Sequence, residues 1–138
     1  MRIYFAGSIR GGRDDVELYI DIIEYLKNFG EVLTEHIGNQ IISSDGENNM
    51  SDLDIHDRDM NWLLDSDIII AEVTNPSLGV GYEIGRAIEN NKKIICLYRK
   101  NNKNRLSAMI AGSEKIININ YSNLNDFKLL IDKHLKKT

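Results

Sequence analysis

The chain of 138 residues contains one cysteine, Cys96, and one proline, Pro76. A lone cysteine excludes an intramolecular disulfide, and its place in an apolar run predicts a buried, unreactive thiol. No apolar run is long enough to span a membrane and no secretory leader is recognisable, so a cytoplasmic protein is expected. The net charge of −4 provides no basic field for nucleic acid or for an anionic membrane, and neither is an expected partner.

The composition that remains is that of an ordinary globular domain. Hydrophobic residues make up 42% of the chain and charged residues 28%, which is enough for a single well-filled core at this length. No internal repeat and no linker divides the sequence. We therefore expect one domain over residues 1–138.

Apolar runs alternate with segments of helical periodicity along the chain. Ser51 is a predicted helix N-cap, and Gly30 is expected to end the first helix in a left-handed conformation. Residues 37–50 are polar and lack periodicity, which predicts a long loop of the kind that often forms a lid. Strands are predicted at residues 3–6, 31–34, 67–73, 92–98 and 115–119, and helices at about 13–29, 51–64, 79–91, 106–111 and 123–134.

Strands that alternate with helices and are apolar throughout predict an α/β fold with a parallel sheet covered on both faces. With five strands the expected order is 2-1-3-4-5, a flavodoxin-like, Rossmann-like doubly wound sheet. This order reverses between strands 1 and 3, and ligands bind at such a reversal. The site is therefore expected where these two strands end.

Two glycine-rich segments follow those two strands. The first, AGSIRGG, matches neither a P-loop nor the dinucleotide fingerprint. Its hydroxyl at Ser8 and guanidinium at Arg10 suit a phosphate monoester, although a flexible turn would have the same composition. In the second segment, PSLGVGYE, Ser77 is either a helix N-cap or a phosphate donor, and Gly79 would let the backbone approach a ligand.

Two carboxylates are candidates for acid–base and nucleophilic chemistry. Glu83 is predicted in the first turn of a helix, where the helix dipole stabilises its ionised form and suits a nucleophile. Asp59 shares a predicted helix face with Ile55, Trp62 and Leu63, so burial would raise its pKa and suit a general acid. The alternatives are an ordinary dipole-favoured glutamate and a solvated aspartate on an acidic helix. As a pair, they match what cleavage of a glycosidic bond requires.

Tyr4 lies in the first predicted strand, close to the expected site, and its hydroxyl needs a partner if the ring is buried. The histidines His36 and His56 are isolated, and no cluster of Cys, His and Asp has the spacing of metal ligands. We therefore expect no metal, and the sequence contains no cofactor motif either.

Together these segments resemble the 2′-deoxynucleoside 5′-phosphate N-hydrolases, relatives of the nucleoside 2-deoxyribosyltransferases. The likeness follows the order of the chain and covers most of it, except the 37–50 loop and the part after Gly112. It implies hydrolysis of the N-glycosidic bond of 2′-deoxynucleoside 5′-monophosphates to free base and 2-deoxyribose 5-phosphate. The matching stretches are YFAGSIRGGR (4–13), VLTEH (32–36), DMNWLLDSDIIIAEVTNPSLGVGYEIGRAI (59–88), KKIICLYR (92–99) and LSAMIAG (106–112).

The resemblance also implies roles for individual residues. Glu83 attacks the anomeric carbon or stabilises its oxocarbenium-like state, Tyr4 orients Glu83, and Asp59 protonates the departing base. Ser107 reaches the phosphate in the neighbouring subunit's site, which makes the enzyme at least a homodimer. The other implied substrate-binding positions, several of them for the 5′-phosphate, are Gly7, Ser8, Ile9, Arg10, Gly11, His36, Ser77, Gly79 and Met109.

The residue at position 77 separates two branches of this resemblance. The deoxyribosyltransferases typically carry an acidic residue where this chain has Ser77, and a carboxylate there would repel a phosphate dianion. Hydrolysis of a nucleotide is therefore favoured over base exchange on a nucleoside. The alternatives are a ribonucleotide N-hydrolase acting on CMP-like substrates, a nucleoside 2-deoxyribosyltransferase, and a nucleotide-binding sensor without turnover. The presence of Tyr4, Asp59 and Glu83 together argues against the sensor.

Overall fold

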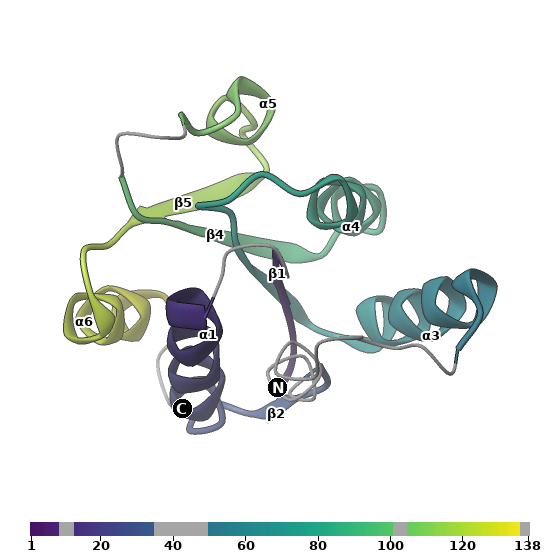
Figure 1. The fold of residues 1–138 in the computed structure, drawn as a ribbon, viewed down its shortest axis with the longest axis horizontal. Coiled ribbons are helices and arrows are strands. Elements are labelled where there is room, and N and C mark those ends of the chain that lie inside the picture. The colour runs from purple at the N-terminus through teal and green to yellow at the C-terminus, as the bar shows by residue number, and fades with distance from the viewer. Residues whose placement is uncertain (9–12, 35–49, 101–104, 136–138) are drawn as a thin grey trace.

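A computed structural model describes residues 1–8, 13–34, 50–100 and 105–135 of the chain. Within these ranges five parallel strands form one sheet in the order β2-β1-β3-β4-β5, which confirms the predicted topology (Figure 1). The strands are β1 (Arg2–Gly7), β2 (Glu31–Val32), β3 (Ile68–Glu72), β4 (Lys93–Tyr98) and β5 (Ile116–Asn120). The helices are α1 (Arg13–Leu26), α3 (Asp52–Asp65), α4 (Leu78–Glu89), α5 (Ala108–Ala111) and α6 (Leu124–His134).

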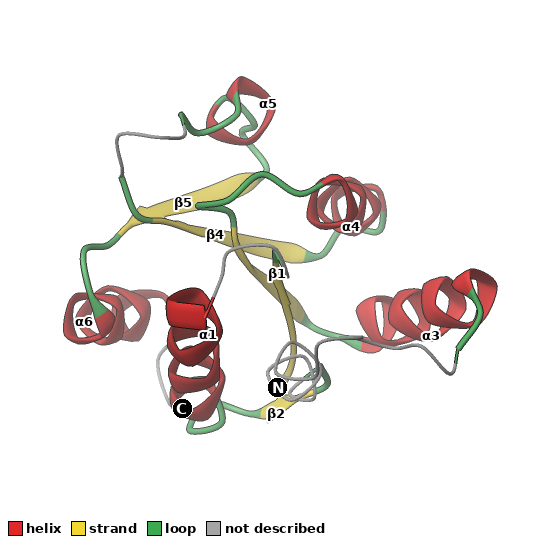
Figure 2. Ribbon diagram, viewed as in Figure 1, coloured by secondary structure: helices red, strands yellow, loops and turns green. Residues whose placement is uncertain are grey.

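Helices cover both faces of the sheet, α1 and α6 on one and α3 and α4 on the other (Figure 2). Successive strand residues point to opposite faces, so Phe5 of β1 joins the core under α1 and α6, whereas Tyr4 joins the core under α3 and α4. Every residue of β3 is buried, as the apolar run predicts for a central strand. Cys96 of β4 is fully buried, which agrees with an unreactive thiol.

The second strand, β2, is shorter than predicted, and the side chain of Thr34 makes the hydrogen bonds to β1 that the backbone of a longer strand would make. Leu33 N still donates to Ile3 O at 2.8 Å. At the next position the Thr34 hydroxyl accepts from Phe5 N at 2.8 Å and donates to Phe5 O at 2.7 Å. Thr34 is fully buried, so its hydroxyl satisfies the edge of β1 where the backbone of β2 has turned away.

The predicted left-handed conformation of Gly30 is wrong. None of the described glycines adopts a φ in the left-handed region, and α1 instead ends at Leu26 in a short series of turns. A Cβ at position 30 would lie 2.0 Å from Met1 O, so close approach of the chain explains this glycine. Among the described residues other than glycine, the left-handed conformation occurs at Asn91 (φ 57°), directly after the C-cap residue of α4, and asparagine tolerates that conformation.

Serine caps set the helix starts that matter for the site. Ser51 Oγ accepts from Asp54 N at 3.1 Å, which confirms the predicted N-cap of α3. The C-terminal ends of β1 and β3 are adjacent, with Gly7 paired to Glu72 in the sheet register. The chain therefore leaves both strands at one edge of the sheet, the place where the sequence predicts a ligand.

Candidate active site

Tyr4 and Glu83 form a hydrogen-bonded pair on the face of the sheet that α3 and α4 cover. The Tyr4 side chain is 1% exposed, and its hydroxyl donates to Glu83 Oε2. Val80, Ile84 and Ala87 form the buried stripe of α4, and Glu83 lies beside this stripe and is half-buried. Packing of α4 on the sheet therefore carries the carboxylate to the Tyr4 hydroxyl.

Burial determines the ionisation of this pair. The pKa of Glu83 is raised to about 7, chiefly by desolvation; the Tyr4 hydrogen bond acts in the opposite direction, and the charge of Asp59 adds to the rise. Burial also raises the pKa of Tyr4, and the neighbouring Glu83 charge adds to the effect. Tyr4 therefore remains a protonated donor, while Glu83 changes charge near neutral pH.

The predicted place of Glu83 in the first turn of its helix is wrong. Helix α4 begins at Leu78 and has no acidic residue in its first turn, so Glu83 lies in the second turn, where the effect of the helix dipole has declined. The expected stabilisation of the ionised form is therefore outweighed by desolvation, and the pKa moves up rather than down.

Asp59 approaches the pair from α3. Its charge raises the pKa of both Tyr4 and Glu83, which places the carboxylate within electrostatic reach of the two. Met60 and Leu63 are the buried residues of α3, and the Asp59 side chain, 29% exposed, lies at the edge of the packed face. The structure thus brings Tyr4, Asp59 and Glu83 together from three separate elements.

Arg58 is a neighbour of Asp59 that the sequence analysis missed. Its Nε and Nη2 donate to Asp59 Oδ1 at 3.1 and 3.0 Å, and its guanidinium lies 4.9 Å from the centre of the Trp62 ring. Its charge lowers the pKa of Tyr4, in opposition to the charge of Asp59. The available signal was a basic residue directly before the candidate acid on an otherwise acidic helix.

Ser77 and Gly79 stand at the start of α4. Ser77 Oγ accepts from Val80 N at 3.2 Å, so in this structure the hydroxyl acts as the helix N-cap, one of the two roles that the sequence suggests. A Cβ at position 79 would meet no atom closer than Ser77 Oγ at 3.8 Å. A side chain would therefore fit at position 79 without a clash, so packing does not explain this glycine. The position lies at a helix N-terminus, which favours anions.

Gly7 and Ser8 lie at the end of β1, at the same edge of the sheet. A Cβ on Gly7 would lie 2.9 Å from Tyr19 Cε2, so packing under α1 requires this glycine whether or not a ligand binds. Ser8 is 2% exposed. The other predicted binding positions of this part of the chain, Ile9, Arg10, Gly11 and His36, lie outside the described residues.

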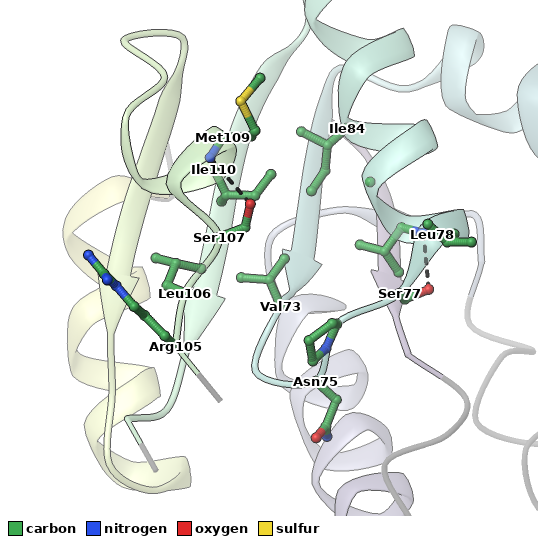
Figure 3. A pocket seen from close by; sticks show the side chains of 13 residues that line it. Val73, Asn75, Ser77, Leu78, Ile84, Arg105, Leu106, Ser107, Met109 and Ile110 are labelled. Carbon is green, nitrogen blue, oxygen red and sulfur yellow. Dashed lines mark hydrogen bonds between the residues drawn. The ribbon is translucent and has the colours of Figure 1, made fainter. Parts of the chain in front are cut away.

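A cavity of about 420 Å³ lies between the start of α4 and the segment that contains α5 (Figure 3). Ser77 and Ser107 line opposite walls of it, and Ser107 Oγ accepts from Met109 N at 3.2 Å. Tyr4, Asp59 and Glu83 are not among its lining residues. The lining consists of Val73, Asn75, Pro76, Ser77, Leu78, Val80, Gly81, Ile84, Arg105, Leu106, Ser107, Met109 and Ile110.

In the described parts of the chain, no three His, Cys, Asp or Glu side chains are grouped so that they could hold a metal ion. His56 is exposed and contacts Asp57 and Tyr82, its ring nitrogens lying 2.9 Å from Asp57 Oδ1 and 2.8 Å from the Tyr82 hydroxyl.

No described helix is both long and apolar enough to cross a membrane. The cytoplasmic location stays a prediction.

Comparison with known proteins identifies the family. The model of the nucleoside 2-deoxyribosyltransferase family matches residues 3–127, and the chain belongs to this family. It is 54% identical over 115 residues to a 5-hydroxymethyl-dUMP N-hydrolase of Tetraodon nigroviridis, covering 83% of this chain and 81% of the relative. It is 56% identical over 113 residues to a protein of the same name from Danio rerio, covering 82% and 79%.

A solved structure shows the same fold at lower sequence identity. The CMP N-glycosidase of Clostridium botulinum superposes with a TM-score of 0.72 at 22% identity, over 98% of this chain and 100% of the other. At this level of identity the match supports the doubly wound architecture alone. The family assignment itself agrees with the resemblance that the sequence motifs indicate.

Proposed function

We propose that this protein hydrolyses the N-glycosidic bond of 2′-deoxynucleoside 5′-monophosphates, releasing the free base and 2-deoxyribose 5-phosphate. The observation that carries the proposal is the convergence of Tyr4, Asp59 and Glu83 in a chain 54% identical to a 5-hydroxymethyl-dUMP N-hydrolase. That relative is named for a substrate that is itself a deoxynucleoside 5′-monophosphate.

The two carboxylates divide the reaction between them. In its ionised form Glu83 attacks the anomeric carbon, or stabilises its oxocarbenium-like state, as the bond from that carbon to the base nitrogen breaks. The bonding electrons leave with the base, which takes a proton from the Asp59 carboxyl group. Water then adds hydroxide to the anomeric carbon, any bond from that carbon to Glu83 breaks and its electron pair returns to the Glu83 carboxylate, and the remaining proton of the water returns to the Asp59 carboxylate.

Tyr4 prepares Glu83 for this role. Its hydroxyl donates to one carboxylate oxygen, Oε2, and thereby fixes the orientation of the group. The same hydrogen bond lowers the pKa of Glu83 against the effect of burial. A buried carboxylate with one oxygen held and a pKa near neutrality is poorly solvated and ready to react.

The 5′-phosphate is proposed to bind where β1 and β3 end. The start of α4, with Ser77 and Gly79, supplies backbone N–H groups and the positive end of a helix dipole. Ser8 and Arg10 belong to the segment that follows β1 and would complete the cradle. Ser77 carries no charge and could turn its hydroxyl from Val80 N to the phosphate, whereas an acidic residue would repel it.

The protein is further proposed to act as a homodimer in which Ser107 reaches the phosphate of the neighbouring subunit's site. Two apolar side chains beside the cavity are conspicuously exposed, Leu78 at 97% and Met109 at 83%. Apolar side chains grouped around a hollow are typical of a surface that another chain covers. Ser107 lines the same cavity and is the N-cap of the short helix α5.

The test is release of free base from a panel of purified nucleotides. We expect release from 5-hydroxymethyl-dUMP, dGMP or dCMP, because a deoxyribose lacks the electron-withdrawing 2′-hydroxyl that destabilises positive charge at the anomeric carbon. GMP and CMP should act at most as weak inhibitors, and deoxyguanosine should be a very poor substrate. Preferential release from the ribonucleotides would overturn the deoxynucleotide assignment, and equal rates with deoxyguanosine and dGMP would favour a transferase.

A further inference from the structure

A second polar cluster lies on the opposite face of the sheet from Tyr4 and is used by no step above. We call it the sheet-edge network; its members are Asp15, Glu72, Thr74, Asn75, Arg99 and Tyr121. At its centre is Glu72, the last residue of β3, whose side chain is fully buried. A carboxylate in such a position must be paired and hydrogen-bonded.

Both oxygens of the Glu72 carboxylate are occupied. Oε1 accepts from Thr74 N at 2.7 Å, and Oε2 accepts from the Thr74 hydroxyl at 3.0 Å. Oε2 also accepts from Arg99 Nε at 3.3 Å and from the Tyr121 hydroxyl. These contacts tie together the chain segments that follow β3, β4 and β5.

Arg99 extends the network to the first helix. Its Nη2 donates to Asp15 Oδ1 at 2.8 Å, and Asn75 Nδ2 donates to Asp15 Oδ2. Its backbone N–H donates to the Thr74 hydroxyl at 2.9 Å. One guanidinium thus spans two carboxylates, a task that suits the fork of donors on arginine.

The network joins the two segments that are proposed to hold phosphate. Asp15 lies in the first turn of α1, directly after the glycine-rich segment that follows β1. Thr74 and Asn75 lie in the short connection between β3 and Ser77. Within the sheet, Glu72 pairs with Gly7, the residue before Ser8. The ion pairs therefore set the position of the start of α1 relative to the connection between β3 and Ser77.

Stability alone does not account for this arrangement. Two partly buried ion pairs lose hydration that their attraction scarcely recovers, and apolar residues of similar size often stabilise a fold equally well. Charged groups that share forked hydrogen bonds do, however, fix a geometry closely. The arrangement joins loops rather than filling the core, which points to a positioning role.

We propose that Glu72, Arg99 and Asp15 are positioning residues that hold the Thr74–Ser77 segment and the start of α1 in register for the substrate's 5′-phosphate. The proposal rests on the proposed function and adds residues that do not touch the substrate. Its consequence is specific: loosening the network weakens recognition of the phosphate and leaves the carboxylate chemistry on the other face of the sheet intact.

Two conservative variants test this. Asp15→Asn preserves the shape of the side chain but replaces one acceptor oxygen by an NH₂ donor. Either Arg99 or Asn75 therefore loses its hydrogen bond to this side chain. Arg99→Lys retains the charge but cannot span Glu72 and Asp15 together. Asp132→Asn is the matched control: it removes an exposed carboxylate on the same face of the sheet, one that accepts from the Tyr25 hydroxyl at 2.6 Å and is not a member of the sheet-edge network.

We expect KM for the deoxynucleotide to rise about 10-fold in both variants, with kcat within about 2-fold of wild type. The dissociation constant of 2-deoxyribose 5-phosphate, measured by titration without turnover, should rise by the same factor. In both variants, the rate of cleavage of the phosphate-free deoxynucleoside should be unchanged. In the control variant Asp132→Asn, all of these quantities should remain at their wild-type values. These measurements are made at a temperature below the unfolding midpoint of every variant.

Other results would overturn the proposal. Unchanged binding of 2-deoxyribose 5-phosphate, or equal losses on nucleotide and nucleoside, would show that the network has no phosphate-specific effect. Failure of both variants to fold would assign the network a purely structural role. Wild-type protein that binds 2-deoxyribose 5-phosphate but releases no base would reject the proposed function while the binding titration still decides this inference.

Discussion

The carboxyl group of Glu83 illustrates how burial sets the chemistry of one residue. Its pKa rises from 4.5 to about 7 because the packed interior disfavours the charge. A raised folded-state pKa contributes stability that is fully present below the unfolded value and is lost as pH rises through the folded value. The proposed attack requires ionised Glu83. The same ionised carboxylate lowers the free energy of unfolding at pH values above about 7, because it is buried.

Replacement of Glu83 by glutamine separates these two effects. Glu83→Gln retains the shape and can still accept from Tyr4, but it never ionises. We expect kcat/KM to fall about 1,000-fold or more while nucleotide binding persists. The free energy of unfolding should rise above wild type at pH 8, by up to about 3 kcal/mol, and not at pH 4. Base release near the wild-type rate would contradict the mechanism.

The neighbours of Glu83 should move its titration in opposite directions. The Tyr4 hydrogen bond lowers the pKa of Glu83, and the charge of Asp59 raises it. The acidic limb of the kcat/KM profile, which reports ionisation of Glu83, should therefore move to higher pH in Tyr4→Phe and to lower pH in Asp59→Asn. Steady-state rates between about pH 5 and pH 9 measure the position of the acidic limb in each variant and in the wild type. Two shifts of the same sign would show that the limb belongs to another group.

The Asp59 variant carries a second expectation. Asp59→Asn cannot protonate the departing base, so it should slow the natural substrates strongly. An analogue whose base leaves without protonation should be affected much less. Equal slowing of both substrates would assign Asp59 an electrostatic role and leave the proton donor elsewhere.

At the scale of elements, the start of α4 combines a structural and a proposed binding role. Ser77→Asp retains an N-cap, because aspartate caps helices as well as serine does. Its charge should nevertheless repel the 5′-phosphate, and we expect KM for the nucleotide to rise about 100-fold and KM for the nucleoside to change by less than about 3-fold. Ser77→Ala loses about 1 kcal/mol of capping and adds no repulsion, so its effect on the nucleotide KM should be smaller.

The elements themselves could largely be predicted from the sequence, because alternation of apolar runs with helical periodicity reports burial directly. Errors arose where distant parts of the chain decide the outcome. Gly30 is required by the approach of Met1, and β2 ends early because the Thr34 hydroxyl bonds to β1. The ionisation of Glu83 and the ion pair of Asp59 with Arg58 likewise depend on packing that no local pattern contains.

At the scale of the whole molecule, the sheet divides the chemistry between its faces. The three proposed catalytic residues lie on the face covered by α3 and α4, and the sheet-edge network lies on the other. The proposed catalytic residues and the sheet-edge network both lie near the C-terminal ends of β1 and β3, which are adjacent in the sheet. The exposed Leu78 and Met109 lie at that end of α4 and on α5, so the proposed dimer surface adjoins the proposed phosphate site.

A mixing experiment tests whether Ser107 serves the neighbouring subunit. In a mixed dimer of Glu83→Gln with Ser107→Ala, the site that retains Glu83 receives its serine from the other chain and is fully wild type. Random exchange of the two impaired variants should therefore restore about a quarter of the wild-type sites. Base release is measured before and after the subunits exchange, and light scattering measures the mass of the assembly. If light scattering shows a dimer but subunit exchange does not restore base release, Ser107 acts within its own chain. If light scattering shows a monomer, a site shared between two subunits is excluded.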